Sequence, residues 1–586
     1  MIDLNSPGTY LHWWIVQISL SNLMVIVVMV VIFGVALLIP FPKPHTGDVE
    51  PGPGTATESE DAPPTAPPGP DDHMWTARVR RFAVRKLPPN KALPDRQPAY
   101  VASWVYVFGV ASLAALGVVV VSGFLIALGG LDWWHTNPVG HFFNSLHLWS
   151  VELFMALIVI HLWGKFWMAS WRGRRKLTWI TGVLAFGASV TEALTGYVSQ
   201  QNFDSQWIST NAKDAFNAAG VGRFFNVMNF GQMILWHVLL FPIVLILLVG
   251  IHVVMVRVRG VAHPIKTRLQ DATSDASDWR GATRRYDILK EGAIASVIVV
   301  VVAVVLAAVL SSPDKAPLTI QTWANAAPAD FLATAQGELA GATETANYGP
   351  PYNNGTHSVQ QILISPQRIV GVGEPINAPV VFVLNPLGHL SATDPALASA
   401  LARYSAATPA QQNAWNAAYS NALNKVAFSG GTPVLPAAND GPVPEMMTAE
   451  LTLARSGALD TSLLAGDNFY GTDFTKPLLF LEDGTYFAQV ASADHLLGNQ
   501  WGVMNETGSY PGQPWLWLYT AWYQISPFST NPSVDMIAIG LTSLLTLLLL
   551  AIPFLPGLRD IPRWIPLHRL IWRSYYDRSG SPPNVE

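Results

Sequence analysis

The chain of 586 residues has no cysteine. This absence excludes disulfides, zinc sites built from thiolates, cysteine-bound iron–sulfur clusters and haem attached through thioether bonds. Charged residues are also few, at 12%, whereas soluble proteins average about a quarter. Because 50% of the residues are hydrophobic, the composition is that of a membrane protein. Any haem in it would have to be held non-covalently by His or Met.

The hydrophobic residues are concentrated in runs of about 20, the length at which a helix crosses a bilayer. We predict seven spans, at about residues 14–40, 103–128, 147–168, 178–199, 233–256, 291–311 and 534–556. Clusters of Lys and Arg precede the second span and follow the third, fifth and seventh, so they all fall on one side of the membrane. The positive-inside rule makes that side the cytoplasm. We therefore expect a multi-pass protein of a bacterial plasma membrane, with its N-terminus outside and its C-terminus inside.

The segment between the last two spans is expected outside the cell, and its 16 Asp and Glu against 6 Lys and Arg agree with that side. The predicted fold class is an all-α membrane helical bundle of about seven transmembrane helices with a large mixed α/β extracytoplasmic domain. Strands are expected at RIVGVGEP and APVVFVLN, and helices at 395–426 and 446–458. The predicted parts are an N-terminal transmembrane helix (1–41), a cytoplasmic Pro-rich linker and basic segment (42–100), a four-helix core (101–258), a cytoplasmic loop (259–289), a transmembrane helix (290–311), the extracytoplasmic domain (312–532), a transmembrane helix (533–556) and a cytoplasmic tail (557–586).

Four histidines lie in two of the apolar runs. His147 and His161 are fourteen residues apart, and His237 and His252 are fifteen apart. An α-helix turns ~100° and rises ~1.5 Å per residue, so each pair lies on one face, roughly 21–23 Å apart along the axis. Both helices run inward, which pairs His147 with His237 near the outside and His161 with His252 near the cytoplasm. Each pair suits a bis-histidine haem, although a lone membrane histidine can also serve packing or proton relay.

Glycines repeat at the same spacing on two neighbouring spans. Gly109 and Gly123 are fourteen residues apart, as are Gly182 and Gly196. A glycine lets a flat macrocycle approach the backbone, so these four are candidate haem contacts. Glycine is also common in membrane helices, where it marks close helix packing.

Residues 101–258 resemble the four-helix, haem-binding half of cytochrome b, the membrane subunit of quinol:cytochrome c oxidoreductases. The resemblance is carried by the His and Gly pairs, by WITG at 179–182 and TGYV at 195–198, and by Pro242. The final two spans and the tail look similar to those of actinobacterial homologues. The resemblance implies that the four histidines are the axial ligands of two b-type haems, so that residues 101–258 form a dihaem core.

The same resemblance implies a respiratory function and a set of partners. Quinol would be oxidised near the outer haem, one electron would cross the membrane through the two haems, and protons would be released outside. A Rieske iron–sulfur protein and a c-type cytochrome would be separate subunits, and the complex would be dimeric. Contacts with membrane lipid are expected, and none with nucleic acid.

The chain departs from the family pattern at the outer quinol site. The family's Pro-Glu-Trp-Tyr motif is absent, and the nearest string, PEMM at 444–447, is interpreted as a chance match. Glu152 and Glu192, both in the outer halves of their helices, are therefore candidate proton acceptors in catalysis. The alternative for both acids is structural pairing with a neighbouring polar group. Asp204 is expected at a loop surface.

The sequence is also compatible with two other functions. The chain could be a haem-bearing electron conduit and docking scaffold without a quinol-oxidation site of its own, which the missing motif favours. It could also resemble a transmembrane ferric reductase, a class that stacks two haems on similarly spaced histidines. The cytoplasmic segments show no Gly-rich dinucleotide fingerprint, which makes this the weaker alternative.

Overall fold

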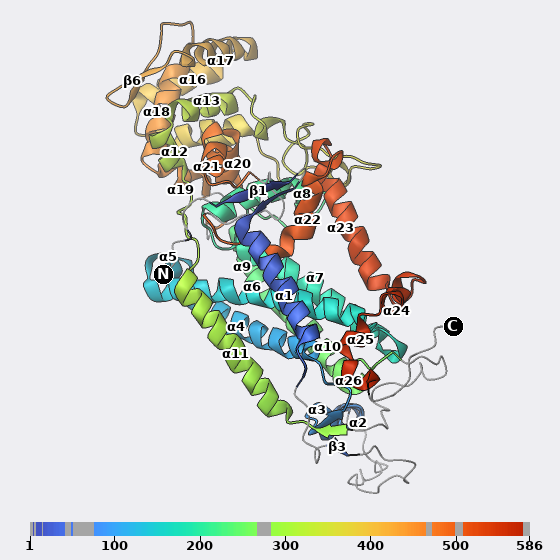
Figure 1. Cartoon of the computed structure of the whole chain (residues 1–586). Helices are drawn as coiled ribbons and strands as arrows, with labels where there is room; N and C mark the ends of the chain where they lie inside the picture. The colour runs from blue at the N-terminus through green and yellow to red at the C-terminus, as the bar shows by residue number, and fades with distance from the viewer. Residues whose placement is uncertain are drawn as a thin grey trace.

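The computed structural model describes residues 4, 8–13, 16–41, 49–50, 75–265, 283–464, 471–497 and 508–577. The predicted linker therefore lies largely outside the described residues, as does the end of the predicted tail. The described chain is mostly helical, with a bundle of long helices below and a cluster of shorter helices above in the view of Figure 1.

Seven helices are long and apolar enough to cross a membrane, which confirms the predicted number of spans. They run over Leu20–Leu38, Trp104–Gly129, Pro138–Trp167, Gly173–Val198, Phe230–Arg259, Ile288–Leu310 and Val534–Ala551. In the labels of Figure 1 they are α1, α4, α6, α7, α9 with α10, α11 and α23. The first begins later than predicted, because Tyr10–Trp13 (β1) and Val16–Ser19 (β2) pair as an antiparallel hairpin before it.

The bundle is built from two tightly packed helix pairs. Helix α4 (Val107–Gly129) packs along α6 (Pro138–Trp167), and α7 (Lys176–Val198) packs along α10 (Phe241–Arg259). Helix α11 (Ile288–Leu310) covers α4 and α6 from the side. Small buried residues such as Ala111 and Ala115 on α4 allow this close approach, as is usual between membrane helices.

The segment 200–231, which connects two of the predicted spans, contains the helix α8 (Phe203–Ala218). Its polar sequence does not mark a loop, because polar residues such as Ser205 and Ser209 are buried beside Phe203 and Ile208. The Asn202 side chain caps the helix by accepting the Ser205 N–H at 2.9 Å. Asp204, expected at a loop surface, lies in the first turn and is 1% exposed.

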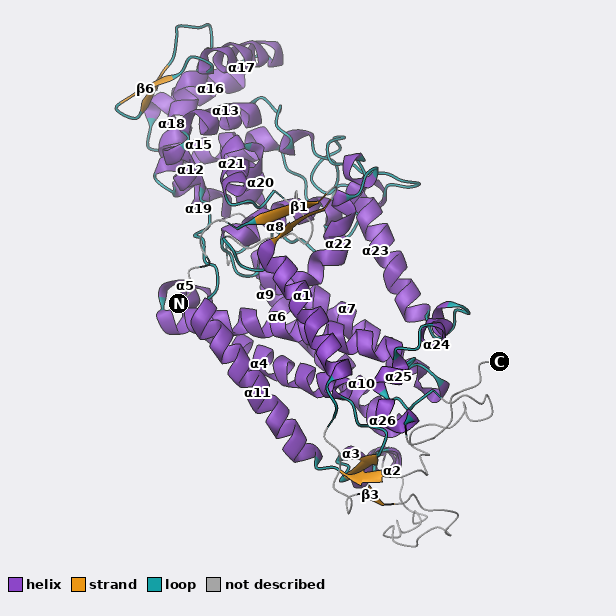
Figure 2. Ribbon diagram, in the orientation of Figure 1, coloured by secondary structure: helices purple, strands orange, loops and turns teal. Residues whose placement is uncertain are grey.

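The described part of 312–532 is a helical domain, so the expectation of a mixed α/β domain was wrong for these residues. The second predicted strand is helical, at Pro379–Leu390. Of the first, RIVGVGEP, the initial three residues end the helix Pro366–Val370 and the others are irregular. Each helix starts with a proline, which favours the first turn of a helix. The helices predicted in 395–426 and 446–458 are confirmed. Figure 2 shows a hairpin, β6 (Ala427–Ser429) with β7 (Thr432–Val434), at the edge of this domain.

We call the helices from α12 to α21 the insert domain. Their bounds are α12 Ile320–Ala326, α13 Pro328–Leu339, α14 Pro366–Val370, α15 Asn385–Leu390, α16 Pro395–Ala406, α17 Pro409–Leu423, α18 Val443–Arg455, α19 Ala458–Leu464, α20 Thr475–Asp483 and α21 Thr485–Ala493. One apolar core joins this domain to α8 and the outer end of the bundle, since Phe203, Phe331 and Phe480 belong to one buried cluster. The PEMM string lies in α18, with Glu445 exposed, far from any membrane span in sequence.

The opposite end of the bundle is closed by short elements from distant parts of the chain. The strands β3 (Val49–Glu50), β5 (Thr283–Arg285) and β4 (Arg96–Pro98) form a small antiparallel sheet. The remaining helices are α2 Trp75–Lys86, α3 Pro89–Ala92, α5 Leu131–Thr136, α22 Trp517–Ala521, α24 Ile561–Trp564, α25 His568–Ile571 and α26 Arg573–Tyr576. The Trp572 indole donates to the Tyr106 hydroxyl at 2.7 Å, which ties the C-terminal helices to α4.

Candidate functional site

The four predicted histidines meet as two pairs inside the bundle. His147 on α6 faces His237, with their ring centroids 6.1 Å apart and the rings nearly perpendicular. His161 on α6 and His252 on α10 line one cavity of about 490 Å³. The pairing expected from helix direction is therefore the pairing in the structure.

A glycine lies directly beneath each imidazole. A Cβ placed on Gly109, Gly123 or Gly182 would come within 3.0 Å of the Cε1 atom of a histidine, and one on Gly196 within 2.4 Å. The histidines concerned are, in the same order, His161, His147, His252 and His237. The glycines were predicted to admit a macrocycle, whereas the group that the structure places against them is the imidazole. A side chain at any of the four positions would displace the ring.

The backbone beneath each ring also fixes its orientation. The Nδ1 atom of His147 lies 3.1 Å from the Val119 carbonyl, and that of His237 lies 3.1 Å from the Glu192 carbonyl. Each carbonyl belongs to the residue four before the glycine, and His252 makes the equivalent bond to Thr178. An Nδ1–H donor leaves Nε2 free as the ligand atom, the arrangement usual for metal-bound histidine.

The residue just before the glycine supplies a second contact. The hydroxyl oxygens of Ser122, Thr195 and Thr181 lie 3.1, 3.5 and 3.3 Å from the Nδ1 atoms of three of the histidines. The fourth glycine follows Phe108, and the Nδ1 atom of His161 is buried without a hydrogen-bond partner among the described residues. The Ser-Gly and Thr-Gly dipeptides are thus a signal in the sequence for these contacts, in addition to the spacing of the glycines.

The fifteen-residue spacing of the second pair has a structural cause. Residues Trp236–Leu240 form a single wide turn of π-helix, and His237 lies in it. A π turn accommodates one extra residue in an otherwise regular helix. The spacing of fifteen on this helix is therefore equivalent to the spacing of fourteen on α6, and both pairs stay in register.

The two predicted acids lie in different surroundings. The Oε1 atom of Glu192 is 3.2 Å from the Nδ1 atom of His237, so Glu192 faces the His147–His237 pair. This contact is the structural pairing considered as the alternative for Glu192, and it orients the imidazole. Glu152 is buried on α6, and its Oε1 atom has no hydrogen-bond partner among the described residues.

Basic side chains line part of the cavity at His161 and His252. Lys165, Arg175 and Arg257 line it together with the two histidines and the glycines Gly109 and Gly182. A flat apolar ring with carboxylate substituents would meet an apolar wall, two imidazoles and cations at one end. Among the described residues, no three His, Asp or Glu side chains gather as a protein-bound metal ion would require. Two imidazoles per site instead match a haem, whose ring supplies the other ligands.

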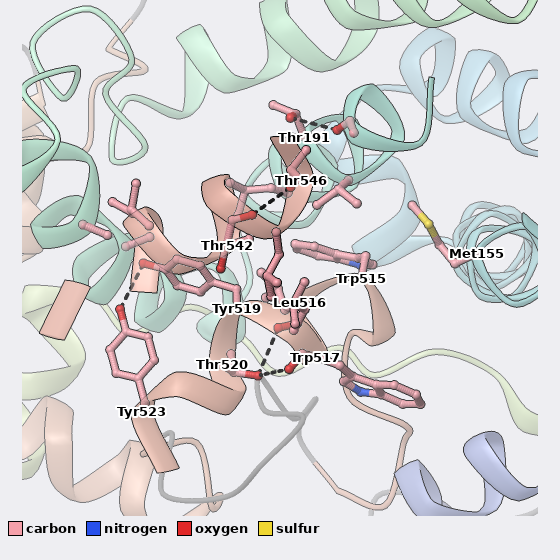
Figure 3. A pocket seen from close by; sticks show the side chains of 18 of the residues that line it. Met155, Thr191, Trp515, Leu516, Trp517, Tyr519, Thr520, Tyr523, Thr542 and Thr546 are labelled. Carbon is pink, nitrogen blue, oxygen red and sulfur yellow. Dashed lines mark hydrogen bonds between the residues drawn. The ribbon is translucent and has the colours of Figure 1, made fainter. Parts of the chain in front are cut away.

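A second, larger cavity of about 1040 Å³ is lined by α6, α7, α8, α22 and α23, and it shares Val183 and Phe186 of α7 with the first (Figure 3). It was not predictable from residue spacing, because it is assembled from segments more than 300 residues apart. At its outer end α8 is joined to the insert domain through Lys213, which lies 2.7 Å from Glu482 and 3.3 Å from Asp214. Burial acts to lower the pKa of Lys213, but these two carboxylates raise it well above its usual value.

These features define a class: a membrane helical bundle that presents two stacked pairs of glycine-supported imidazoles. Residues 152–318 match the family model described as cytochrome b(N-terminal)/b6/petB. The matched residues, which include His161, His237 and His252, are therefore similar to cytochrome b and b6.

Individual relatives match the same region. A cytochrome b6 from Heliomicrobium gestii is 28% identical over 143 residues, which cover 22% of this chain and 67% of that protein. A cytochrome bc complex cytochrome b subunit from Chlorobaculum thiosulfatiphilum is 26% identical over 138 residues, covering 22% of this chain and 32% of that protein. A solved chain described as hyperthermophilic respiratory Complex III is 16% identical with a TM-score of 0.29, over 66% of this chain and 96% of that chain.

Proposed function

We propose that the chain is the dihaem cytochrome b subunit of a respiratory, quinol-oxidising bc-type complex. His147 and His237 would hold the outer b-type haem, and His161 and His252 the inner one. When bound, the haems supply one-electron carriage across the membrane. The observation that carries the proposal is that each of the four imidazoles rests on a glycine of the neighbouring helix, at two levels of the bundle. The Nδ1 atoms of His147 and His237 also face a backbone carbonyl.

The distribution of basic residues indicates the direction in which electrons would cross the membrane. With the basic segments in the cytoplasm, the first pair and the insert domain lie toward the outside. Quinol oxidised at that end would release protons there, one electron would pass inward along the two pairs, and the other would go to a high-potential partner. The chain has no cysteine for an iron–sulfur cluster, so a Rieske protein and a c-type cytochrome would be separate subunits of a dimeric complex in the bacterial plasma membrane.

Glu152 and Glu192 remain proposed proton-linked residues of the outer half. Glu192 contacts His237, so its charge would act on the outer haem through that ligand. We assign Glu152 a proton-accepting role because its carboxyl group is buried and its Oε1 atom has no hydrogen-bond partner among the described residues.

A second candidate function is an electron conduit that docks partners but oxidises no quinol. The missing Pro-Glu-Trp-Tyr motif favours it. The two functions are separated by adding quinol to the purified complex while its absorption spectrum is recorded. Quinol oxidation predicts that both haem bands become reduced and that a quinol-site inhibitor prevents this. If dithionite reduces both bands and quinol reduces neither, the conduit function is correct and the proposal is wrong.

A further inference from the structure

The large cavity beside α7 has the shape of a site for a long apolar molecule. Its lining includes Val534 at the start of α23 and Leu549 near the end, which are roughly 22 Å apart along a helix. Between them the wall is formed by aliphatic and aromatic side chains of α7 and α23, with Met155 of α6 on another side (Figure 3).

The polar end of this cavity is acidic. Asp214 from α8 and Asp535 from the first turn of α23 line it, beside Tyr519 and Tyr523. None of the described residues lining the cavity is Lys, Arg or His. Asp214 is paired with Lys213, 3.3 Å away, which does not itself line the cavity. An anionic phospholipid headgroup would therefore meet two carboxylates and no lining cation, which is unfavourable. A neutral head group that donates hydrogen bonds would be accepted.

A chain of hydrogen bonds leads away from the cavity at this end. The Tyr519 and Tyr523 hydroxyls are 3.0 Å apart, and the Tyr523 hydroxyl donates to the Asp535 carboxylate. The other Asp535 oxygen accepts from the Gln360 amide, which lies in the loop before α14 of the insert domain. Figure 3 shows the two tyrosines joined in this way, with Tyr519 next to Leu516 and Thr542.

We propose that this cavity is the quinol-binding site of the protein and that Tyr519, Tyr523 and Asp535 carry the first proton away; the inference rests on the function proposed above. The isoprenoid tail would lie along α23, and one quinol hydroxyl would donate to the Tyr519 oxygen. The step is a proton transfer only. The quinol O–H bond breaks, each tyrosine passes on its own proton and receives another, and the new O–H bond forms on the Asp535 carboxylate.

The cavity extends along helices that carry both histidine pairs. Met155 of α6 lies eight residues, about 12 Å, after His147 and six residues, about 9 Å, before His161. Leu194 of α7 lines the cavity two residues before Gly196, which supports His237. Glu192 lies on the opposite, histidine-facing side of α7. In the proposed site Asp535 is therefore the primary proton acceptor, whereas Glu192 contacts His237.

Filling the cavity tests occupancy. Gly187 lines it, and a Cβ at this position meets nothing within 4 Å, so the side chain of Gly187→Leu starts in open space and adds volume to the cavity. Gly117→Leu is the matched control, because Gly117 is an exposed glycine of α4 with equally open space. We expect Gly187→Leu to lower the co-purified quinone and the apparent affinity for decyl-ubiquinol about tenfold, with the dithionite-reduced spectrum unchanged. Equal quinone content in the two variants, or loss of phospholipid alone from Gly187→Leu, would overturn the proposal.

Removing the acceptor tests the proton path. Asp535→Asn keeps the shape of the side chain, and Tyr519→Phe removes one hydroxyl. We expect either change to slow haem reduction by decyl-ubiquinol about a hundredfold and to alter its pH profile, while the quinone content remains. Tyr404→Phe in the insert domain, where Tyr404 bonds Asn416, is the control. Wild-type rates and pH profile in both path variants would exclude this route.

The outcomes separate the inference from the proposed function. If decyl-ubiquinol fails to reduce the wild-type haems, both are wrong. If it reduces the wild type and all of the cavity variants equally, the function stands and quinol binds elsewhere.

Discussion

Each of the four histidines lies against a glycine, and this contact is the strictest requirement that the core makes on individual residues. The glycine has to be free of a side chain because the imidazole occupies the position of its Cβ. The backbone carbonyl beneath then holds the ring in one orientation for three of the four histidines. Position and orientation of the ligand atom are thus set by the main chain of the neighbouring helix.

We predict that Gly123→Ala displaces His147 and weakens outer haem binding, because overpacking of this kind costs about 1–3 kcal/mol. The haem content and the reduced-minus-oxidised spectrum of the purified protein measure the effect. Gly117→Ala, on the same helix with nothing within 4 Å, is the control and should match the wild type. Full haem content with an unchanged spectrum in Gly123→Ala would contradict the requirement.

Glu192 provides a second prediction at this scale. Its carboxylate faces His237, and a negative charge beside a ligand stabilises the oxidised iron. Glu192→Gln should therefore raise the reduction potential of the outer haem by tens of mV, where about 59 mV is a tenfold change for one electron. A redox titration measures the shift, and Glu192→Asp should restore part of it. An unchanged outer potential would show that Glu192 carries no charge felt by the haem.

Residue spacing predicted the histidine pairs correctly, because helical periodicity alone decides which residues share a face. Spacing did not show that the imidazole rather than the macrocycle rests on the glycines, since the distance between two helices is a tertiary quantity. The partner of Glu192 was unpredictable for the same reason. His237 lies 45 residues after Glu192 in the sequence and on another helix, so only the packing of the two helices brings them together.

At the scale of elements, the π turn Trp236–Leu240 reconciles two different sequence spacings. Fifteen residues of regular α-helix would rotate His252 by about 100° relative to a spacing of fourteen. The wide turn absorbs that extra residue next to the ligand itself. Such turns occur frequently at functional sites.

We predict that deleting Val238, an exposed residue of the π turn, converts the turn to regular helix and leaves both haems bound. Deleting Val159, an exposed valine of α6, should instead rotate His161 away from the face of His147, because α6 has no wide turn to absorb the change. Haem content and the split of the b-type bands report the result. Loss of a haem from the Val238 deletion would show that the π turn has another role.

The long apolar helices were predictable from composition, whereas the elements of segment 200–231 and of the insert domain were only partly so. Phe203–Ala218 forms a helix whose buried face is mostly polar in sequence, and its burial depends on the insert domain packed above it. Pro379–Leu390 was read as a strand from its run of valines, but tertiary packing overrides that preference.

At the scale of the whole molecule, the proposed topology places the insert domain and the α2 segment on opposite sides of the membrane. Because the chain has no cysteine, a single introduced cysteine reports the side of the membrane on which it lies. We predict that Ser429→Cys, in the exposed β6–β7 hairpin, reacts with a membrane-impermeant thiol reagent in intact cells. Lys86→Cys, at the exposed end of α2, should react only after the cells are permeabilised. The reverse pattern would invert the proposed direction of electron transfer.

The most direct test of the dihaem function is a redox-titrated absorption spectrum of the purified complex, recorded for the wild type and for His147→Leu. Two b-type transitions are predicted for the wild type, both reduced by quinol, and loss of the outer one for His147→Leu. His141→Leu, a histidine of the same helix that bonds Ser311 instead, should retain both. Two transitions in His147→Leu, or no haem in the wild type, would contradict the assignment of the four histidines.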